Sequence, residues 1–189
     1  MMNINHTALL VIDVQEIMFY GEHPVYRGEE VFMKIKALID QAKQANIPVI
    51  YIQHTGSDDS LMGRGKPLWQ IKSSIQPEPG EPVFLKYTPD AFHETGLRDK
   101  LNSLEINQLI ITGMQTEICV DTTCRSAFAL GYQITLVSDA HTTFDTEILP
   151  AEKIIIHHNQ IIQSWFGEVK SSGEIKLFLE ENKKTISSE

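Results

Sequence analysis

The chain has 189 residues, of which 42% are apolar and 22% are charged, and its formal net charge is −9. This composition suits one globular domain with its own core. The excess of negative charge argues against nucleic acid or an anionic membrane as a partner, because binding phosphate groups requires a basic surface. Two cysteines do not make a disulfide framework, and the start lacks the features of a signal peptide, so we expect a reduced, cytoplasmic protein.

Apolar runs and amphipathic stretches alternate along the chain. Strands are expected at 8–14, 49–53, 82–86, 107–112, 133–138 and 167–171, and helices at 28–46, 90–103, 116–131, 147–163 and 173–183. The strand runs are apolar on both faces, which is typical of parallel strands covered by helices on each side. The pattern predicts an α/β fold in a single domain, 1–189, with a mostly parallel sheet between two helical layers.

Two segments stand outside this alternation. Residues 54–81 are rich in Gly, Ser, Asp and Pro. A connection of this length in a compact domain is usually functional, so we expect a lid or a substrate loop. The polar C-terminal tail, from about 183 to 189, is expected to be frayed.

Three reactive side chains follow predicted strands, where open α/β sheets place their sites. Asp13 lies at the end of the first strand, Lys86 at the end of the third, and Cys119 shortly after the fourth. Each could be structural when considered alone: a capping carboxylate, a solvated strand end and a small buried side chain. Together they supply a base, a cation and a thiol at a helix start, which favours nucleophilic chemistry. Cys124, further into the helix, is interpreted as packing.

Four stretches together resemble the isochorismatase-like cysteine hydrolases, a family that includes nicotinamidases, N-carbamoylsarcosine amidase and streptothricin hydrolase. They are "LLVIDVQ" (9–15), "LKYTPDAF" (85–92), "ITGMQTEICVDTTCRSAFALGY" (111–132) and "LVSDAHTT" (136–143). Each stretch is a modest signal, but their order and spacing are specific. The resemblance covers roughly residues 6–165, and it implies a three-layer αβα sandwich with a six-stranded sheet.

The resemblance also implies roles for particular residues. It implies a catalytic triad of Asp13, Lys86 and Cys119, and a non-proline cis peptide bond between Met114 and Gln115. The backbone N–H groups of Gln115 and Cys119 would form an oxyanion hole. The implied reaction is hydrolysis of a small-molecule amide through a thioester, in a homo-oligomer (a dimer or tetramer) without a cofactor.

The histidines bear on a metal site. Nicotinamidases resemble one another in an Asp-x-His after the second strand, whereas here Ile52 and Gln53 precede His54. One histidine without clustered partners is not a ligand set, so we expect no metal, which argues against nicotinamidase activity. Cys119 argues against isochorismatase activity proper, because those enzymes lack the cysteine nucleophile. His141 lies after "SDA", just beyond the fifth predicted strand, and could approach the site.

The substrate pocket is the least defined feature of the sequence. The residues that could line it are Met18, Phe19, His54, Trp69, Tyr87 and Phe92. An aromatic lining would suit a planar amide, although the same residues could pack under a lid or at a subunit interface. Arg64 and Lys66 could bind an anionic group of the substrate or be solvated loop charges.

Three functions are therefore open. The favoured one is a metal-independent cysteine amidohydrolase. A binding module that uses the same fold without catalysis is the first alternative. The second is a redox sensor using Cys119 and Cys124, although their spacing across a helix start makes a disulfide hard to close.

Overall fold

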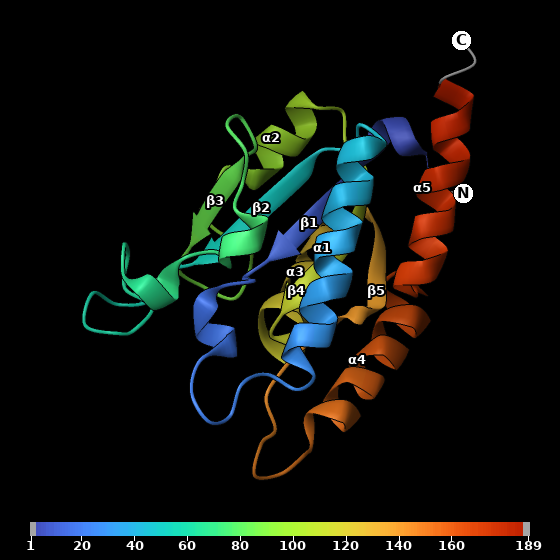
Figure 1. Cartoon of the computed structure of the whole chain (residues 1–189). Helices are drawn as coiled ribbons and strands as arrows, with labels where there is room; N and C mark the ends of the chain where they lie inside the picture. The colour runs from blue at the N-terminus through green and yellow to red at the C-terminus, as the bar shows by residue number, and fades with distance from the viewer. Residues whose placement is uncertain (1–2, 187–189) are drawn as a thin grey trace.

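Six strands form one sheet in the computed structural model, which describes residues 3–186 (Figure 1). The strands are β1 (Thr7–Ile12), β2 (Val49–His54), β3 (Val83–Lys86), β4 (Gln108–Met114), β5 (Gln133–Thr142) and β6 (Glu168–Lys170). Their order is β3-β2-β1-β4-β5-β6, and every neighbouring pair is parallel. The predicted fold class, a three-layer α/β sandwich around a six-stranded sheet, is confirmed.

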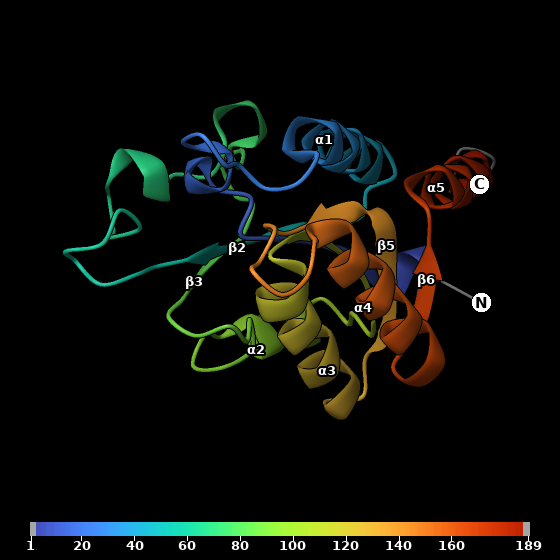
Figure 2. The same cartoon turned by 90° about the horizontal axis from the view of Figure 1, so that it is seen from below.

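Helices cover both faces of the sheet (Figure 2). One face carries α1 (Gly28–Gln44) and α5 (Ser172–Ile186), and the other carries α2 (Leu97–Ser103), α3 (Asp121–Ala129) and α4 (Ala151–Trp165). The central strand β1 is buried along its whole length and supplies alternate side chains to two hydrophobic clusters. Leu9 and Val11 pack with α1, whereas Leu10 and Ile12 pack on the side of α2 and α3. This alternation is why the strand is apolar throughout.

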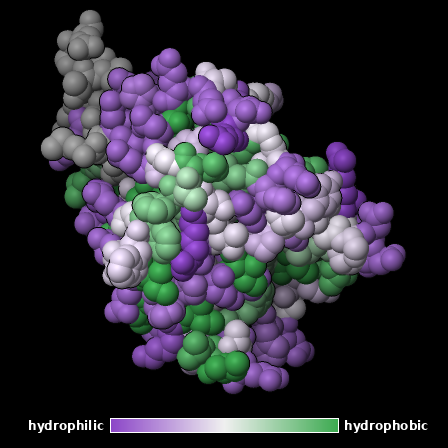
Figure 3. Space-filling view, turned by 180° about the vertical axis from the view of Figure 1, so that it is seen from behind, coloured by the Kyte–Doolittle hydropathy of each residue, from purple (hydrophilic) through white to green (hydrophobic). Residues whose placement is uncertain are grey.

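The rear face of the molecule carries both hydrophobic and hydrophilic residues (Figure 3). Figure 3 shows hydrophobic residues on the rear face in small groups among hydrophilic ones. None of the helices described is both long enough and apolar enough to cross a bilayer.

Some boundaries differ from the prediction. The expected helix 90–103 is helical only from Leu97, because the carboxylate of Asp90 accepts hydrogen bonds from the backbone N–H of Phe92 and the hydroxyl of Ser126 and holds a turn. At the C-terminus, α5 continues to Ile186, so the tail expected to be frayed is helical as far as it is described, and residues 187–189 lie outside the described part.

The long segment 54–81 is anchored at its middle. The backbone carbonyl of Trp69 accepts hydrogen bonds from the side-chain amides of Gln15 (2.6 Å) and Gln53 (2.9 Å), and its indole N–H donates to Thr55 Oγ1 (3.0 Å). An antiparallel bridge between Gln15 and Ile71 follows. Two short 3₁₀ helices, Pro67–Trp69 and Ser73–Ile75, lie within the segment. Trp69, one of the expected pocket residues, also anchors this loop.

Gly113 allows the end of β4 to approach β1 closely. Its φ is +129°, and a Cβ at this position would lie 2.0 Å from the carbonyl oxygen of Ile12. The register between β4 and β5 also shifts between Ile111 and Gly113. Only glycine fits both the backbone angle and the space.

We expect Gly113→Ala to lower the free energy of unfolding by about 3 kcal/mol or more, because strain at positive φ adds to a clash with backbone. Gly80→Ala is the matched control, since Gly80 has φ +98° but nothing within 4 Å of a Cβ. Urea-induced unfolding of both variants measures the difference. Equal losses of stability in Gly113→Ala and Gly80→Ala would show that a clash with the Ile12 backbone adds nothing to the strain at positive φ.

Candidate active site

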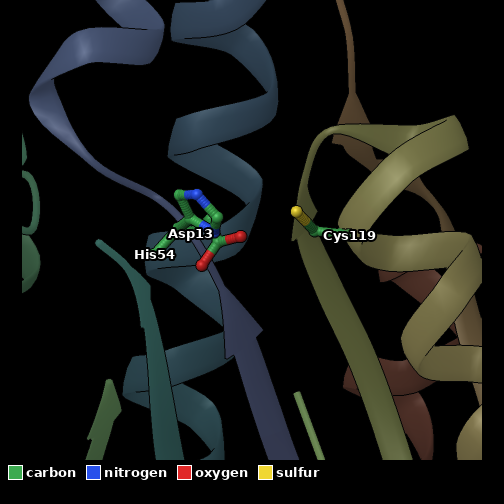
Figure 4. Close-up of side chains that lie close together, drawn as sticks. All are labelled: Asp13, His54 and Cys119. Carbon is green, nitrogen blue, oxygen red and sulfur yellow. The ribbon is translucent and has the colours of Figure 1, made fainter. Parts of the chain in front are cut away.

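The candidate site lies where the strand order of the sheet reverses. β1 pairs with β2 on one side and with β4 on the other, and ligands of open α/β sheets bind beyond the strands at such a point. Asp13 follows β1, and the last residues of β2 and β3, His54 and Lys86, are register partners. Cys119 follows β4. Figure 4 shows Asp13 and His54 on one side of the site, with Cys119 facing them from the other.

The ammonium group of Lys86 occupies the centre of this cluster. Lys86 is completely buried. Its Nζ lies 2.7 Å from Asp13 Oδ2, 3.1 Å from Cys119 Sγ, 3.1 Å from the carbonyl oxygen of Thr88 and 3.3 Å from His54 Nδ1. Cys119, Thr88 and His54 meet hydrogen-bond geometry and match the three donors of an ammonium, and Asp13 adds an ion pair. The three residues predicted from strand ends are thus in direct contact through one cation.

Asp13 has an unusual backbone and an incompletely bonded side chain. Its φ is +51°, a left-handed conformation that Asp tolerates better than most residues, and its N–H donates to the carbonyl of Ile52 (2.9 Å). The carboxylate is fully buried, and among the residues described its oxygens have no partner that satisfies hydrogen-bond geometry; the ion pair with Lys86 is its one charged contact. Lone pairs therefore remain to receive a proton.

The thiol of Cys119 is neutral in the resting protein. Burial, followed by the Asp13 charge, raises its pKa to about 12, and the ammonium of Lys86 opposes both only in part. For Lys86, burial acts to lower the pKa, but Asp13 and Cys119 outweigh burial and raise it. At rest Lys86 is therefore an ammonium, and Cys119 keeps its proton.

Burial and the Asp13 charge act against the thiolate form that a helix start favours. Cys119 lies in a π-helical segment, Thr116–Val120, which precedes α3, and its side chain is only 8% exposed. Burial is the largest cause of the raised pKa of this thiol, and the Asp13 charge is the next. The expected helix 116–131 is accordingly split in two at Asp121.

His54 contacts the ammonium rather than forming a metal site. The donor atoms of Asp13, His54 and Cys119 lie within 4.8 Å of one another, a group that could hold a metal ion among the residues described. The Lys86 ammonium, however, lies within 3.3 Å of all three atoms. A divalent cation would have to displace this like charge, so these residues do not fit a metal centre. Burial, followed by the Lys86 charge, lowers the pKa of His54, which keeps the imidazole neutral.

The nucleophile segment begins with a cis peptide bond between Met114 and Gln115, where the family resemblance places one. The carbonyl of Gln115 then accepts hydrogen bonds from the N–H groups of Ile118 (3.3 Å) and Val120 (3.1 Å). These bonds curl residues 115–120 into one turn. The two expected oxyanion donors, Gln115 and Cys119, stand at opposite ends of that turn.

Three of the expected pocket residues make packing contacts in the two hydrophobic clusters. Met18 is a buried member of the cluster under α1, and Phe19 makes an edge-to-face contact with Phe32 at 5.7 Å between ring centroids. Phe92 stacks on Tyr132 at 5.6 Å. For these residues the alternative of ordinary packing describes the contacts, whereas Tyr87, next to Lys86, is 66% exposed.

Two residues near the site were missed by the sequence reasoning. Gln15 is fully buried, and its side chain pairs with the backbone of His54 in both directions, at 2.9 and 3.0 Å, which fixes that residue beside Lys86. The carbonyl of Thr88 accepts from the ammonium. The role of Gln15 could have been inferred from the sequence, because an amide side chain shortly after a buried strand is unusual. The role of Thr88 could not, because a backbone carbonyl leaves no signal in the sequence.

We expect Lys86→Met to lower the free energy of unfolding by about 3–5 kcal/mol, because it leaves the buried Asp13 carboxylate unpaired. Adding Asp13→Asn should restore about 2 kcal/mol or more of that loss by removing the charge. Urea-induced unfolding at neutral pH measures the double-mutant cycle.

The surface pair of Lys43 and Glu78, 2.9 Å apart, is the matched control, and its coupling should stay below about 1 kcal/mol. If the buried pair couples no more strongly than this exposed pair, then Asp13 and Lys86 do not form the ion pair described above.

Known proteins share both the sequence pattern and the fold. The isochorismatase domain profile matches residues 7–152. A streptothricin hydrolase of Streptomyces noursei is 32% identical over 143 residues, which cover 76% of this chain and 52% of that protein. Nicotinamidase 3 of Arabidopsis thaliana is 28% identical over 160 residues, covering 77% of this chain and 78% of that protein. The chain thus spans about half the length of the streptothricin hydrolases that it matches.

The fold likeness extends over nearly the whole chain. The crystal structure of a cysteine hydrolase from Pseudomonas syringae pv. phaseolicola superposes with a TM-score of 0.88, covering 96% of this chain and 95% of that one, at 24% identity. At this identity the likeness shows the fold alone, whereas the domain profile covers well over half of the chain. The chain belongs to the isochorismatase family.

Proposed function

We propose that this chain is a cysteine-dependent hydrolase of small amides, with Cys119 as nucleophile, Asp13 as general base and acid, and Lys86 as the cation that holds them together. The observation that carries the proposal is the single buried ammonium, 2.7 Å from the carboxylate and 3.1 Å from the sulfur. Relatives named streptothricin hydrolase and nicotinamidase support a C–N bond as the target.

Acylation couples proton transfer to attack. As the sulfur of Cys119 bonds to the amide carbonyl carbon, Asp13 takes the thiol proton, so that no free thiolate has to exist beforehand. The ammonium of Lys86 stays beside the sulfur and stabilises the negative charge that develops on the sulfur as the proton leaves. The tetrahedral oxyanion accepts hydrogen bonds from the backbone N–H groups of Gln115 and Cys119, and each donor of this kind contributes about 3–4 kcal/mol to lowering the barrier.

The remaining steps restore the enzyme. Protonated Asp13 gives its proton to the leaving nitrogen as the C–N bond breaks, which leaves a thioester on Cys119 and a free amine or ammonia. Water then attacks the thioester, Asp13 takes a proton from it, and that proton returns to the sulfur as the C–S bond breaks. The net reaction is amide plus water to carboxylic acid plus amine.

The same geometry supports a mechanism without a metal. In metal-dependent hydrolysis a divalent cation polarises the carbonyl or the attacking water. Here the position between the Asp13, His54 and Cys119 donors is held by the ammonium of Lys86. Charge stabilisation at the sulfur therefore comes from a side chain that the fold supplies.

We expect the purified protein to release ammonia or an amine from at least one member of a panel of small primary amides, carbamoyl compounds and lactams. Cys119→Ala should lower the rate by about 10³-fold or more, because it removes the nucleophile. Cys124→Ala should retain activity, since Cys124 is completely buried in the core. Dialysis against a chelator should leave the rate unchanged. Turnover that survives Cys119→Ala, or that is lost with the chelator, would contradict the proposal.

A further inference from the structure

A buried polar chain lies behind the nucleophile segment and takes no part in the mechanism above. The hydroxyl of Thr116 lies 2.8 Å from His141 Nδ1, and His141 Nε2 lies 2.9 Å from the side-chain oxygen of Asn159. The amide nitrogen of Asn159 donates to the carbonyl of Ser138 (3.1 Å). His141 is only 1% exposed. The chain therefore connects residue 116 to both β5 and α4.

The partners fix the direction of every hydrogen bond in this chain. Because Asn159 donates to a carbonyl through its nitrogen, its oxygen must accept, so His141 Nε2 carries the proton. Burial lowers the pKa of His141 to about 4, so the ring is neutral and Nδ1 is a pure acceptor. The hydroxyl of Thr116 consequently donates to Nδ1. Each polar group in the chain has one compatible role.

Thr143, which directly follows β5, contacts the segment on either side of Thr116. Thr143 Oγ1 donates to a carboxylate oxygen of Glu117 (2.8 Å), and the side-chain amide of Gln115 approaches the same hydroxyl at 3.5 Å. The backbone of Thr143 is itself fixed, because its carbonyl accepts from the N–H of Tyr26 (2.8 Å). Three successive residues, 115 to 117, are thus held by 141 and 143.

β5 reaches this position only because it is longer than its apolar run. The strand was expected to end at 138 but continues to Thr142, and after the register shift His141 pairs with Gly113 and Thr142 with Met114. An apolar side chain at 141 would fill the core equally well. A buried histidine whose two ring nitrogens are both hydrogen-bonded instead specifies one arrangement of the segment it binds, because any other arrangement leaves the buried groups of Thr116 and His141 unpaired.

We propose that His141 and Thr143, with Asn159 behind them, are positioning residues that hold the turn 115–120 so that its backbone N–H groups point at the substrate oxygen in the transition state. This inference rests on the proposed amide hydrolysis. It differs from the role of Lys86 and Asp13, which act on the sulfur. Disturbing the chain should therefore affect oxyanion stabilisation and leave the reactivity of the thiol unchanged.

The test compares Thr116→Val, which removes the donor hydroxyl at constant shape, with Thr116→Ser, which keeps it. Thr112→Val is the matched control, because Thr112 is also fully buried and its hydroxyl donates to the carbonyl of Leu10, outside the chain described here. Three quantities are measured: kcat and KM for the best amide, the rate of Cys119 alkylation by iodoacetamide, and amide hydrogen exchange of residues 115–120.

For Thr116→Val we expect kcat to fall by about 10- to 100-fold with KM and the alkylation rate unchanged, and hydrogen exchange to rise in residues 115–120 alone. Thr116→Ser should restore kcat, and Thr112→Val should leave it unchanged. An unchanged kcat, a fall in kcat matched by the alkylation rate, or a serine variant as slow as valine would overturn the proposal.

The two proposals can fail separately. If the wild-type protein hydrolyses no amide of the panel, the proposed function fails. Hydrogen exchange still tests the role of His141 in that case. If residues 115–120 exchange equally fast in the wild type and in Thr116→Val, the polar chain through His141 does not hold the turn.

Discussion

The buried ion pair between Lys86 and Asp13 is the constraint on which the rest of the site depends. Neither side chain reaches solvent, so each charge needs the other. Asp13 follows β1 and Lys86 ends β3, and β2 lies between these two strands, so the lysine must extend past His54 to reach the carboxylate. Parallel strands ending at one edge of the sheet make this possible. Thr88 and His54 then occupy the remaining directions around the ammonium.

The same ion pair determines how the thiol is used. In enzymes with a thiolate and an imidazolium, the nucleophile is charged before substrate arrives. Here the carboxylate already pairs with the cation, and burial raises the pKa of Cys119, so the sulfur keeps its proton at rest. Activation must accompany attack, within a cluster whose charges are already balanced. Such a thiol should be a poor target for unspecific alkylation and oxidation, while remaining competent toward a substrate held over it.

The sequence predicted the parts of the fold that depend on local burial. Strands that are covered on both faces appear in the sequence as continuous apolar runs, so their positions were predictable. Because sites in open α/β sheets lie at the carboxyl ends of the strands, Asp13, Lys86 and Cys119 were predicted to lie together. Features that depend on pairing register were not predictable in this way. The contact between His54 and the ammonium follows from the pairing of β2 with β3, and the role of His141 follows from a register shift beside Gly113.

Other differences come from side chains that compete with backbone patterns. Asp90 stabilises a turn where the sequence pattern favours a helix. The buried side chain of Gln15 donates a hydrogen bond to the carbonyl of Trp69 and so fixes the loop 54–81, whose composition alone predicts no fixed structure. Aromatic residues near a site are ambiguous in sequence, because Phe19 can serve a pocket or a core equally well. Only the packed fold shows that it lies against Phe32.

The central claim is that the ammonium pairs with the carboxylate and leaves the thiol neutral. Its most direct test is a pH titration of the thiolate ultraviolet absorbance in a Cys124→Ala background, where Cys119 is the remaining thiol. The account predicts no thiolate below the ordinary thiol pKa of 9.0. With Asp13→Asn added, the pKa should fall by about 1–3 units, because the carboxylate no longer opposes the thiolate. A thiolate already formed at neutral pH with Asp13 intact would contradict the account.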